Sequence, residues 1–452
     1  MKKRTLIYIL TICLLAFLLC ACGSEAAPAA EKAGSETSSP AQEQAADSAV
    51  QEQSAAEEPE PTPVVFSFPD GSSHSPDETE LDLSAFSEQD VLTVVPLLAQ
   101  MPDLQYVDLG YAFPVIEQEV QTQDTRGKIL TSTILVAEDL AYTEETPRLS
   151  WDAVRQVQEA CPQAQVDYHF RLFGKDLSTL DEALDFNHIK MTDEGAAVKA
   201  VLPYMQNCKS LDMDFCGVSC PAMAEIRDAY PDMHVVWRVW FGNDCSVRTD
   251  VDTVLASNLN HVLTDYNTEE MKYLTELKYL DIGHNSYLHD FSFMEYIPDL
   301  EVAIICLSGL HDLNYVSKCT KLEFLEINTL KPGIDLSPLA SLTNLEHLNI
   351  CYDGKVTGYE ALEHLTKLKR LWIGTHTYIP EEYIEHLREV LPDTNINTTE
   401  GTGCGGYWKH SPQGGYDPRY AEIRKTFDYD HYPTSCSSYW NDPLYGAPSF
   451  DH

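Results

Sequence analysis

The sequence lacks the short motifs by which common enzyme classes are recognised. It has no Gly-x-Ser-x-Gly elbow, no Walker-type glycine-rich loop, no dinucleotide fingerprint and no His-Glu-x-x-His zinc helix. Positive charge is scarce, with 30 Lys and Arg against 71 Asp and Glu and a formal net charge of −41. Such a chain is poorly suited to bind nucleic acid or an anionic lipid surface. Catalytic groups can be assembled from distant residues, so an enzyme stays open as an alternative.

The sequence also has no apolar run long enough to span a bilayer. Its N-terminal apolar stretch covers only Leu6 to Leu19, after the positive residues Lys2, Lys3 and Arg4, as is typical of a signal peptide. The stretch ends in Leu-Cys-Ala-Cys22-Gly, which resembles a bacterial lipobox. The resemblance implies a lipoprotein signal peptide over 1–21 and lipid on Cys22, which would hold the protein on the outer face of the cell membrane. An ordinary secretory peptide is the alternative.

The segment that follows has almost no residues that could form a core. Residues 24–63 consist mainly of Ala, Glu, Ser, Gln, Thr and Pro, with no aromatic residue and Val50 as the only bulky aliphatic. Such a composition cannot bury enough apolar surface to offset the chain entropy that folding costs. We therefore expect 22–63 to be a lipid-anchored disordered tether that precedes the folded part.

A period of 22 to 23 residues is evident in the C-terminal half. Five copies of Leu-x-x-Leu-x-Leu, or a close variant, begin at Leu277, Leu300, Leu322, Leu345 and Leu368. Such periodicity is the signature of a repeat protein, because one unit cannot bury its own apolar face and neighbouring units must stack.

These copies resemble leucine-rich repeats of the short bacterial internalin-like class, most clearly over 334–345. The resemblance implies an α/β leucine-rich-repeat solenoid, with a parallel β-sheet on the concave face and helices or short turns on the convex face. We assign the regular array to 268–397. The family's asparagine after the strand is present only as Asn285; the other copies place Ser308, Thr329 or Leu330, Tyr352, and Thr375 or His376 there.

The region 64–267 is related but less regular. Fragments such as Leu81-Asp-Leu83 and Leu184-Asp-Phe186 keep the apolar phase, whereas the spacers are longer. The pattern predicts degenerate units with true helices over 88–100, 151–160, 193–206 and 221–229, the first three capped by Ser87, Ser150 and Thr192. Segment 111–147 fits no repeat and is either an inserted hairpin or a loop.

Residues 398–452 change character again, because glycine and aromatic residues dominate there. A repeat array needs a terminal unit that closes its open core, so we expect this segment to be a cap that packs back onto the last repeats. A separate ligand-binding module built on these aromatics is the alternative.

The outward positions of the predicted strands are the candidate binding surface. Aromatic and arginine residues in a shallow array are typical anchors of protein-binding surfaces, although scattered exposed apolar residues are also common. The candidate ligand-binding residues on the concave face are Tyr279, Asp281, Phe324, Glu326, His347, Asn349, Arg370 and Trp372.

Ten cysteines follow Cys22, and an exported chain could oxidise them. Cys208 and Cys319 take leucine positions, which favours small buried core residues. Cys306 and Cys351 lie two strands apart, about 9.6 Å, which is too far for a disulfide. Cys404 could pair with Cys436 in the cap. Cys216 and Cys220 lack a second ligand pair, so no metal site and no cofactor is predicted.

Together these features favour a non-catalytic surface lipoprotein that binds an extracellular protein or glycan through the repeats. One alternative is an envelope enzyme or assembly factor that acts through the C-terminal aromatic segment. Another is a structural scaffold on the cell surface. The lipid would be its only membrane contact, and fold alone does not choose among these functions.

Overall fold

The computed structural model describes residues 64–123, 126–243, 245–257, 262–399, 408–411 and 413–430. By its contacts the chain separates into Met1–Thr62 and Pro63–His452, and the fold below belongs to the second unit. The signal peptide, Cys22, the tether and the Cys404–Cys436 pair lie outside the described residues. The proposed domain boundaries therefore stay predictions.

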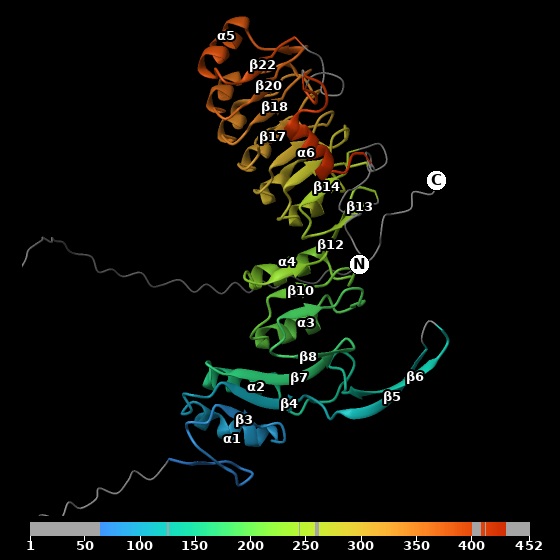
Figure 1. Ribbon diagram of the computed structural model, residues 1–452, viewed down its shortest axis with the longest axis vertical. Coiled ribbons are helices and arrows are strands. Elements are labelled where there is room, and N and C mark those ends of the chain that lie inside the picture. Colours follow the sequence, from blue (N-terminus) through green and yellow to red (C-terminus); the bar gives the residue numbers. More distant parts are fainter. Residues whose placement is uncertain are drawn as a thin grey trace, which may run out of the picture. The chain divides into compact units, whose positions relative to one another are not determined.

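A seven-stranded parallel sheet dominates the C-terminal half (Figure 1). Each strand pairs with the next along this series in a register that aligns the repeats, for example Leu280 with Ala303 and Leu325 with Leu348. The five predicted strand motifs are thus confirmed as neighbours in one sheet. The strands are β14 (Thr253–Leu255), β15 (Tyr279–Asp281), β16 (Val302–Ile304), β17 (Phe324–Glu326), β18 (His347–Asn349), β20 (Arg370–Trp372) and β22 (Asn395–Asn397).

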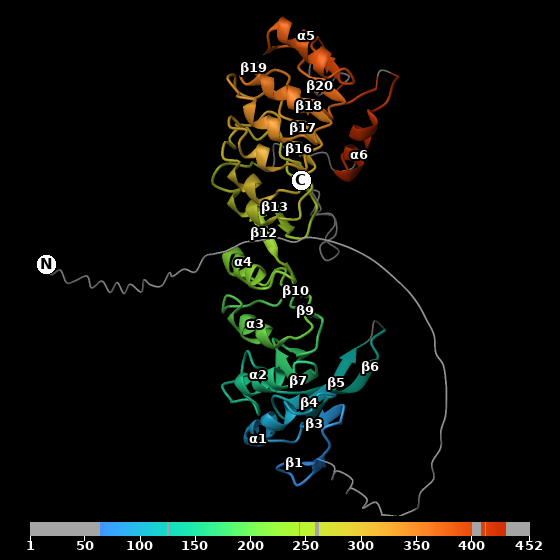
Figure 2. The ribbon, with the colours of Figure 1, turned by 90° about the vertical axis from the view of Figure 1, so that its left-hand side faces the viewer.

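Inward apolar residues explain this sheet. The middle residue of each repeat strand from β15 to β20 is fully buried, and burying such a side chain contributes roughly 1.5–3 kcal/mol. Between the strands the chain forms short 3₁₀ helices, which run along one side of the strands in Figures 1 and 2. They are η2 (Glu269–Tyr273), η3 (Ser292–Tyr296), η4 (Val316–Lys318), η5 (Ser337–Ser341) and η6 (Tyr359–His364).

A left-handed residue follows each of these strands and sets the position of the turn. His284, Leu307, Thr329, Tyr352 and His376 all have positive φ. The residue after each takes the place of the family asparagine, which gives Asn285, Ser308, Leu330, Asp353 and Thr377.

Two of the expected substitutes for that asparagine were therefore wrong. Tyr352 is the left-handed residue itself, and Asp353 follows Leu345 by eight residues, just as Asn285 follows Leu277. In the last copy Thr377 follows Leu368 by nine residues, so one extra residue places it after Thr375 and His376. Polar side chains at this position bond to the backbone near the turns: Asn285 Nδ2 donates to Ile282 O at 2.9 Å, and Thr377 Oγ1 donates to Ile350 O of the preceding repeat at 2.5 Å.

The N-terminal half carries two further sheets, ordered β3-β4-β7-β8 and β9-β10-β11. Pairing is parallel except between β7 and β8. The first sheet contains β3 (Glu80–Asp82), β4 (Tyr106–Tyr111), β7 (Gln165–Leu172) and β8 (Lys175–Ser178); the second contains β9 (Ala183–Asp185), β10 (Ser210–Asp212) and β11 (His234–Val236).

The predicted N-terminal helices are present with shifted ends: α1 (Glu88–Leu98), α2 (Trp151–Ala160), α3 (Ala196–Val201), followed by η1 (Leu202–Tyr204), and α4 (Cys220–Ala229). Ser87 and Ser150 cap the first two as expected. The Thr192 cap is wrong. Gly195 precedes α3, and Asp193 instead accepts the backbone N–H of Ala197.

Segment 111–147 contains an antiparallel hairpin, β5 (Ile116–Gln123) with β6 (Ile129–Val136). The hairpin alternative is thus the correct one. It extends away from β4 and β7 in both views (Figures 1 and 2), and nearly all its side chains are exposed. Two smaller pairs, β1 (Phe66–Ser67) with β2 (Ser73–His74) and β12 (Arg238–Phe241) with β13 (Cys245–Arg248), are also antiparallel.

The last strand of the sheet is preceded by α5 (Glu381–Val390), whose Ile384 and Leu387 are buried in the main core. The pair β19 (Gly354–Lys355) and β21 (Thr377–Tyr378) lies in the same region. The final described helix, α6 (Pro418–Thr426), does not extend the repeat series. It lies beside the strands rather than beyond them (Figure 2). No helix among the described residues is long and apolar enough to cross a membrane.

Candidate functional site: the strand face

The outward residues of β15 to β20 form the surface that we call the strand face. Their two rows follow from the strand register, in which Tyr279, Val302, Phe324, His347 and Arg370 are successive partners. The second row is Asp281, Ile304, Glu326, Asn349 and Trp372. The predicted alignment of the candidate residues in two rows is thus confirmed.

The expectation that these rows are open to a ligand is wrong for this structure. Seven of the eight candidate residues are buried, and only Tyr279 is partly exposed. Glu326 and Asn349 have no exposed surface at all. The cause is the described part of the C-terminal segment, residues 408–411 and 413–430, which we call the strap. Whether these residues contact a ligand stays a prediction.

Trp408 is the centre of the contact between the strap and the strand face. Its ring is 1% exposed and lies among the rings of Phe324, Trp372 and His347, at centroid distances of 5.2, 5.9 and 6.2 Å. Its indole Nε1 donates to Glu326 Oε2 at 2.9 Å. A large aromatic ring with a satisfied N–H is a typical anchor in a buried interface.

Arg370 connects two points of the strap. Its Nη1 donates to the Trp408 carbonyl oxygen at 2.7 Å and lies 3.0 Å from Asp417 Oδ2. Asp417 in turn caps α6, since its Oδ1 accepts the backbone N–H groups of Arg419 and Tyr420. The predicted anchor Arg370 therefore holds the start of α6 rather than facing solvent.

The helix α6 buries one apolar side. Tyr420, Ile423 and Phe427 form one cluster with Leu255, Val302 and Ile304 of the sheet. At the edge of this cluster Arg419 Nη2 donates to Glu323 Oε2 at 2.9 Å.

The far end of the strap contacts Asp281, where the Tyr429 hydroxyl donates to the buried carboxylate. Asp281 also accepts the backbone N–H of Gly283 at 3.1 Å. Burial raises the pKa of Asp281, and burial together with the Asp281 charge raises the pKa of Tyr429. The strap thus spans the face from β20 to β15.

Some of the candidate residues have a structural role that the motif explains. The last residue of several strands accepts the backbone N–H two residues later, as Asp281 does from Gly283 and Asn349 from Cys351. Asp82 and Asp212 do the same in the N-terminal sheets. This is the Asx turn that Asp and Asn favour, so these residues help to end each strand.

His347 is held neutral in this environment. Burial is the main cause that lowers its pKa to about 4, while Asp417 raises it and Arg370 lowers it. Its Nδ1, Asn349 Nδ2 and Trp372 Nε1 are buried without a hydrogen-bond partner.

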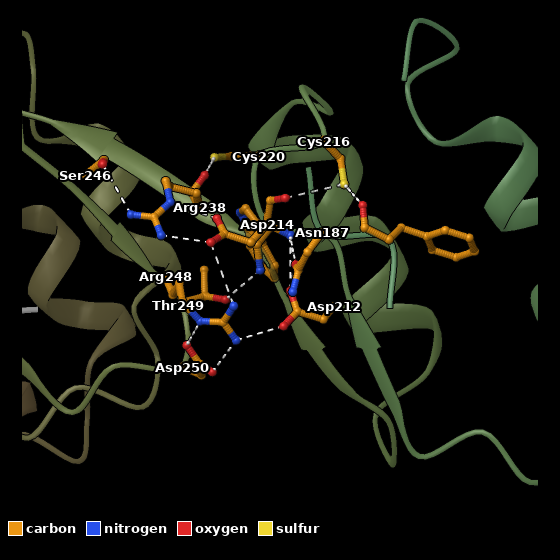
Figure 3. A network of polar contacts seen from close by, with 12 residues as sticks. Asn187, Asp212, Asp214, Cys216, Cys220, Arg238, Ser246, Arg248, Thr249 and Asp250 are labelled. Carbon is orange, nitrogen blue, oxygen red and sulfur yellow. Dashed lines mark hydrogen bonds and ion pairs between the residues drawn. The ribbon is translucent and has the colours of Figure 1, made fainter. Parts of the chain in front are cut away.

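A second polar cluster lies at the junction of the two halves (Figure 3). Arg238 makes a two-pronged ion pair with Asp214, with both N–O distances at 2.8 Å and both side chains almost wholly buried. Arg248 binds Asp212 and Asp250 at 2.9 and 2.8 Å. This cluster connects β10 with the β12–β13 pair, which indicates a structural role.

The cysteines fit the core interpretation. Cys319 is fully buried and Cys208 partly so, and both are free thiols. Cys306 and Cys351 form no disulfide with each other, as their separation predicts. Cys216 and Cys220 are buried thiols beside the junction cluster (Figure 3). Within the described ranges no three His, Cys, Asp or Glu side chains are placed to hold a metal ion.

Comparison with known proteins gives no family model that matches the sequence, and no curated protein matches it either. Several solved structures are similar. An internalin from Listeria monocytogenes is 15% identical over 68% of this chain and 64% of that chain, with a TM-score of 0.27. A leucine-rich-repeat protein from Leptospira interrogans is 14% identical over 67% of this chain and 74% of that chain, with a TM-score of 0.29.

These similar structures are bacterial leucine-rich-repeat proteins. The functional domain of another Listeria internalin, which includes a cysteine ladder, is 12% identical over 50% of this chain and 51% of that chain, with a TM-score of 0.23. This chain spans less than two thirds of the first internalin. At such TM-scores the likeness decides nothing about activity or partners. The resemblance of this chain to leucine-rich repeats rests on the strand motif and on the register of the strands.

Proposed function

We propose that this protein is a leucine-rich-repeat solenoid that acts as a non-catalytic binding scaffold for an extracellular protein. The observation that carries the proposal is the occupied strand face. Seven of the eight sequence-selected residues are buried beneath a polypeptide segment, through ring contacts, ion pairs and a buried indole hydrogen bond. A surface that already binds polypeptide in this way has the chemistry of a protein-binding site.

The same reasoning favours a protein over a glycan as partner. The face combines apolar anchors such as Val302 and Phe324 with carboxylates that accept N–H and O–H donors. Protein interfaces share this combination of a buried apolar centre and a few well-placed polar groups. A glycan ligand would be a different outcome of the experiment below.

We further propose that lipid on Cys22 holds the scaffold on the outer face of a bacterial membrane. Support comes from the lipobox-like sequence and the preceding apolar stretch Leu6 to Leu19. Replacement of Cys22 with Ser should move the protein from the membrane fraction to the medium and abolish labelling by a fatty-acid analogue. Retention of the label in the variant would contradict the anchor.

The binding function can be tested with the unit Pro63–His452. We would cross-link it to extracellular proteins and to a glycan array, then identify what it captures. An Arg370→Ala variant should lose a partner of the strand face, whereas Trp240→Ala, an exposed aromatic off that face, should retain it. Circular dichroism would confirm that both variants fold. Capture that survives Arg370→Ala unchanged would contradict a site on the strand face.

A further inference from the structure

The strap leaves part of the strand face without hydrogen-bond partners. Asn349 Nδ2 and Trp372 Nε1 are buried and have no acceptor. The amide of Asn349 is correctly oriented, because its Oδ1 accepts the Cys351 N–H at 3.1 Å, and an indole nitrogen can only donate. Buried donors of this kind are almost always satisfied in a matched interface. The strand face therefore has more hydrogen-bonding capacity than its own strap uses.

The unpartnered groups gather around one ring. Trp372 and His347 both flank Trp408, and Asn349 is the register partner of Trp372. We call the residues that contact Trp408 the Trp408 pocket: Phe324, Glu326, His347, Arg370 and Trp372. Beside it lies an open cavity of about 540 Å³, lined by residues that include His347, Arg370 and Asp417. The strap thus fills this end of the face incompletely.

Charged side chains also contribute to the contact between the strap and the strand face. The strap presents Lys409 and Arg419 to Glu326 and Glu323, at 3.8 and 2.9 Å. Helix α6 carries three basic residues and one acidic residue, in a chain whose net charge is −41. Residues 408–430 as a whole carry four Lys or Arg and four Asp or Glu, so the charge complementarity lies in these two pairs rather than in the net charge of the strap. Such local complementarity favours specific recognition.

We propose that the strap is an exchangeable internal ligand of the strand face. Its external competitor is a polypeptide segment that inserts an aromatic side chain into the Trp408 pocket, places basic side chains beside Glu323 and Glu326, and brings carbonyl or carboxylate acceptors to Asn349 and Trp372. This inference rests on the proposed function and deepens it, because it names the chemistry of the partner and the step that admits it. The competitor gains the two hydrogen bonds that the strap leaves unmade, and the strap limits access by occupying the same pocket.

The probe that tests exchange is a fluorescent synthetic peptide with the sequence of residues 408–430, added to the full chain. A Trp408→Ala chain has a weakened internal strap, so the peptide should bind it at least about tenfold more tightly than it binds the wild type. A peptide with its own Trp408→Ala change is the matched control and should not bind. Adding Arg370→Ala to the Trp408→Ala chain should abolish binding, since that guanidinium holds the Trp408 carbonyl.

A second variant guards against misfolding. Asp417→Asn removes the charge that faces Arg370 but keeps a good helix N-cap, so it should raise peptide affinity by a smaller factor. If the peptide binds equally weakly to every chain that folds, the proposal that the strap is exchangeable is overturned. If capture in the cross-linking experiment still depended on Arg370, the proposed function would stand without it. Peptide binding that persists in the Arg370→Ala double variant would place the exchange elsewhere and overturn the assigned pocket.

Discussion

The two halves of the protein place outward residues at equivalent strand positions, but these residues are exposed to different degrees. In β9 and β10 the outward positions hold Ala183, Asp185, Ser210 and Asp212, all at least partly exposed. In β16 and β17 the equivalent positions hold Val302, Ile304, Phe324 and Glu326, all buried. The same strand motif thus presents an open polar face in one half and a covered apolar face in the other.

The difference shows how outward carboxylates are used in a repeat sheet. In the N-terminal half Asp212 and the nearby Asp214 bind arginines of the β12–β13 pair, which follows them in the chain. In the C-terminal half Asp281 and Glu326 bind Tyr429 and Trp408, which lie far along the sequence. The β12–β13 pair, which is close in sequence, thus forms a fixed structural contact with these carboxylates. The strap, which is distant in sequence, is by our proposal able to dissociate from them.

The largest effect is expected at the N-terminal joint. Replacement of Asp214 with Ala removes the buried carboxylate that makes two 2.8 Å contacts with the Arg238 guanidinium, which should lower the free energy of unfolding by about 3–5 kcal/mol. Asp185→Ala is the matched control, because its partner Lys175 is 3.5 Å away at the surface, and it should cost at most about 1 kcal/mol. Urea denaturation measures both. Similar losses for the two variants would remove the distinction between joint and open face.

A charge on the covered face should release the strap without unfolding the sheet. Val302→Asp buries an unpaired carboxylate among Ile423 and Phe427, so tryptic cleavage after Arg424 should accelerate at least about tenfold. Ser210→Asp makes the same change at the equivalent open position and should leave the cleavage rate unaltered. Unchanged cleavage in both variants would show that the strap does not depend on this face.

Asp353 takes the position of the family asparagine, so the stability of the wild type should depend on pH where that of an asparagine variant does not. Burial raises its pKa to about 8, and its Oδ2 has no partner. The pKa of Asp353 in the folded state lies above its value in the unfolded state. The contribution of the protonated side chain to the free energy of unfolding is therefore fully present below pH 3.8 and is lost as pH rises toward 8. Asp353→Asn should remove this loss, with a gain over wild type of at most about 1.4 kcal/mol per pH unit across that window. Thermal melts between pH 4 and 8 that stay parallel would contradict this.

The smallest effect is expected at the exposed hairpin. Ile134→Thr on β6 should change the free energy of unfolding by less than about 0.5 kcal/mol, because the side chain is exposed and packs on no core residue. Thermal denaturation measures the change. A loss of more than about 2 kcal/mol would mean that the hairpin is part of the folded core.

Much of this fold can be predicted from the sequence, since the Leu-x-x-Leu-x-Leu period fixes both strand position and register. Ser87 and Ser150 likewise mark helix starts, because their capping chemistry is local. The exact turn residues could not be predicted. In the last copy one extra residue before the left-handed His376 moves the asparagine position to Thr377, and the period of the motif does not reveal such an insertion.

The sequence predicts that residues 398–452 pack back onto the last repeats, but not that they cover the strand face. That cover depends on a contact between residues 82 positions apart, Glu326 and Trp408. Periodicity selects outward positions but does not report what lies over them. One signal was nevertheless present. Val302 and Ile304 are both outward and both apolar in the same strand, which is unusual for a solvated face and indicates a covering segment.

Hydrogen exchange on the unit Pro63–His452 tests most directly whether the strap is a separable occupant of the strand face. The account predicts that α6 amides such as Ala421 and Phe427 exchange through local opening, at least about a hundredfold faster than sheet amides such as Ile305 and Ile327. If α6 amides exchange only with the sheet, at the same rate and through global unfolding, the strap is a fixed part of the fold and the account is contradicted.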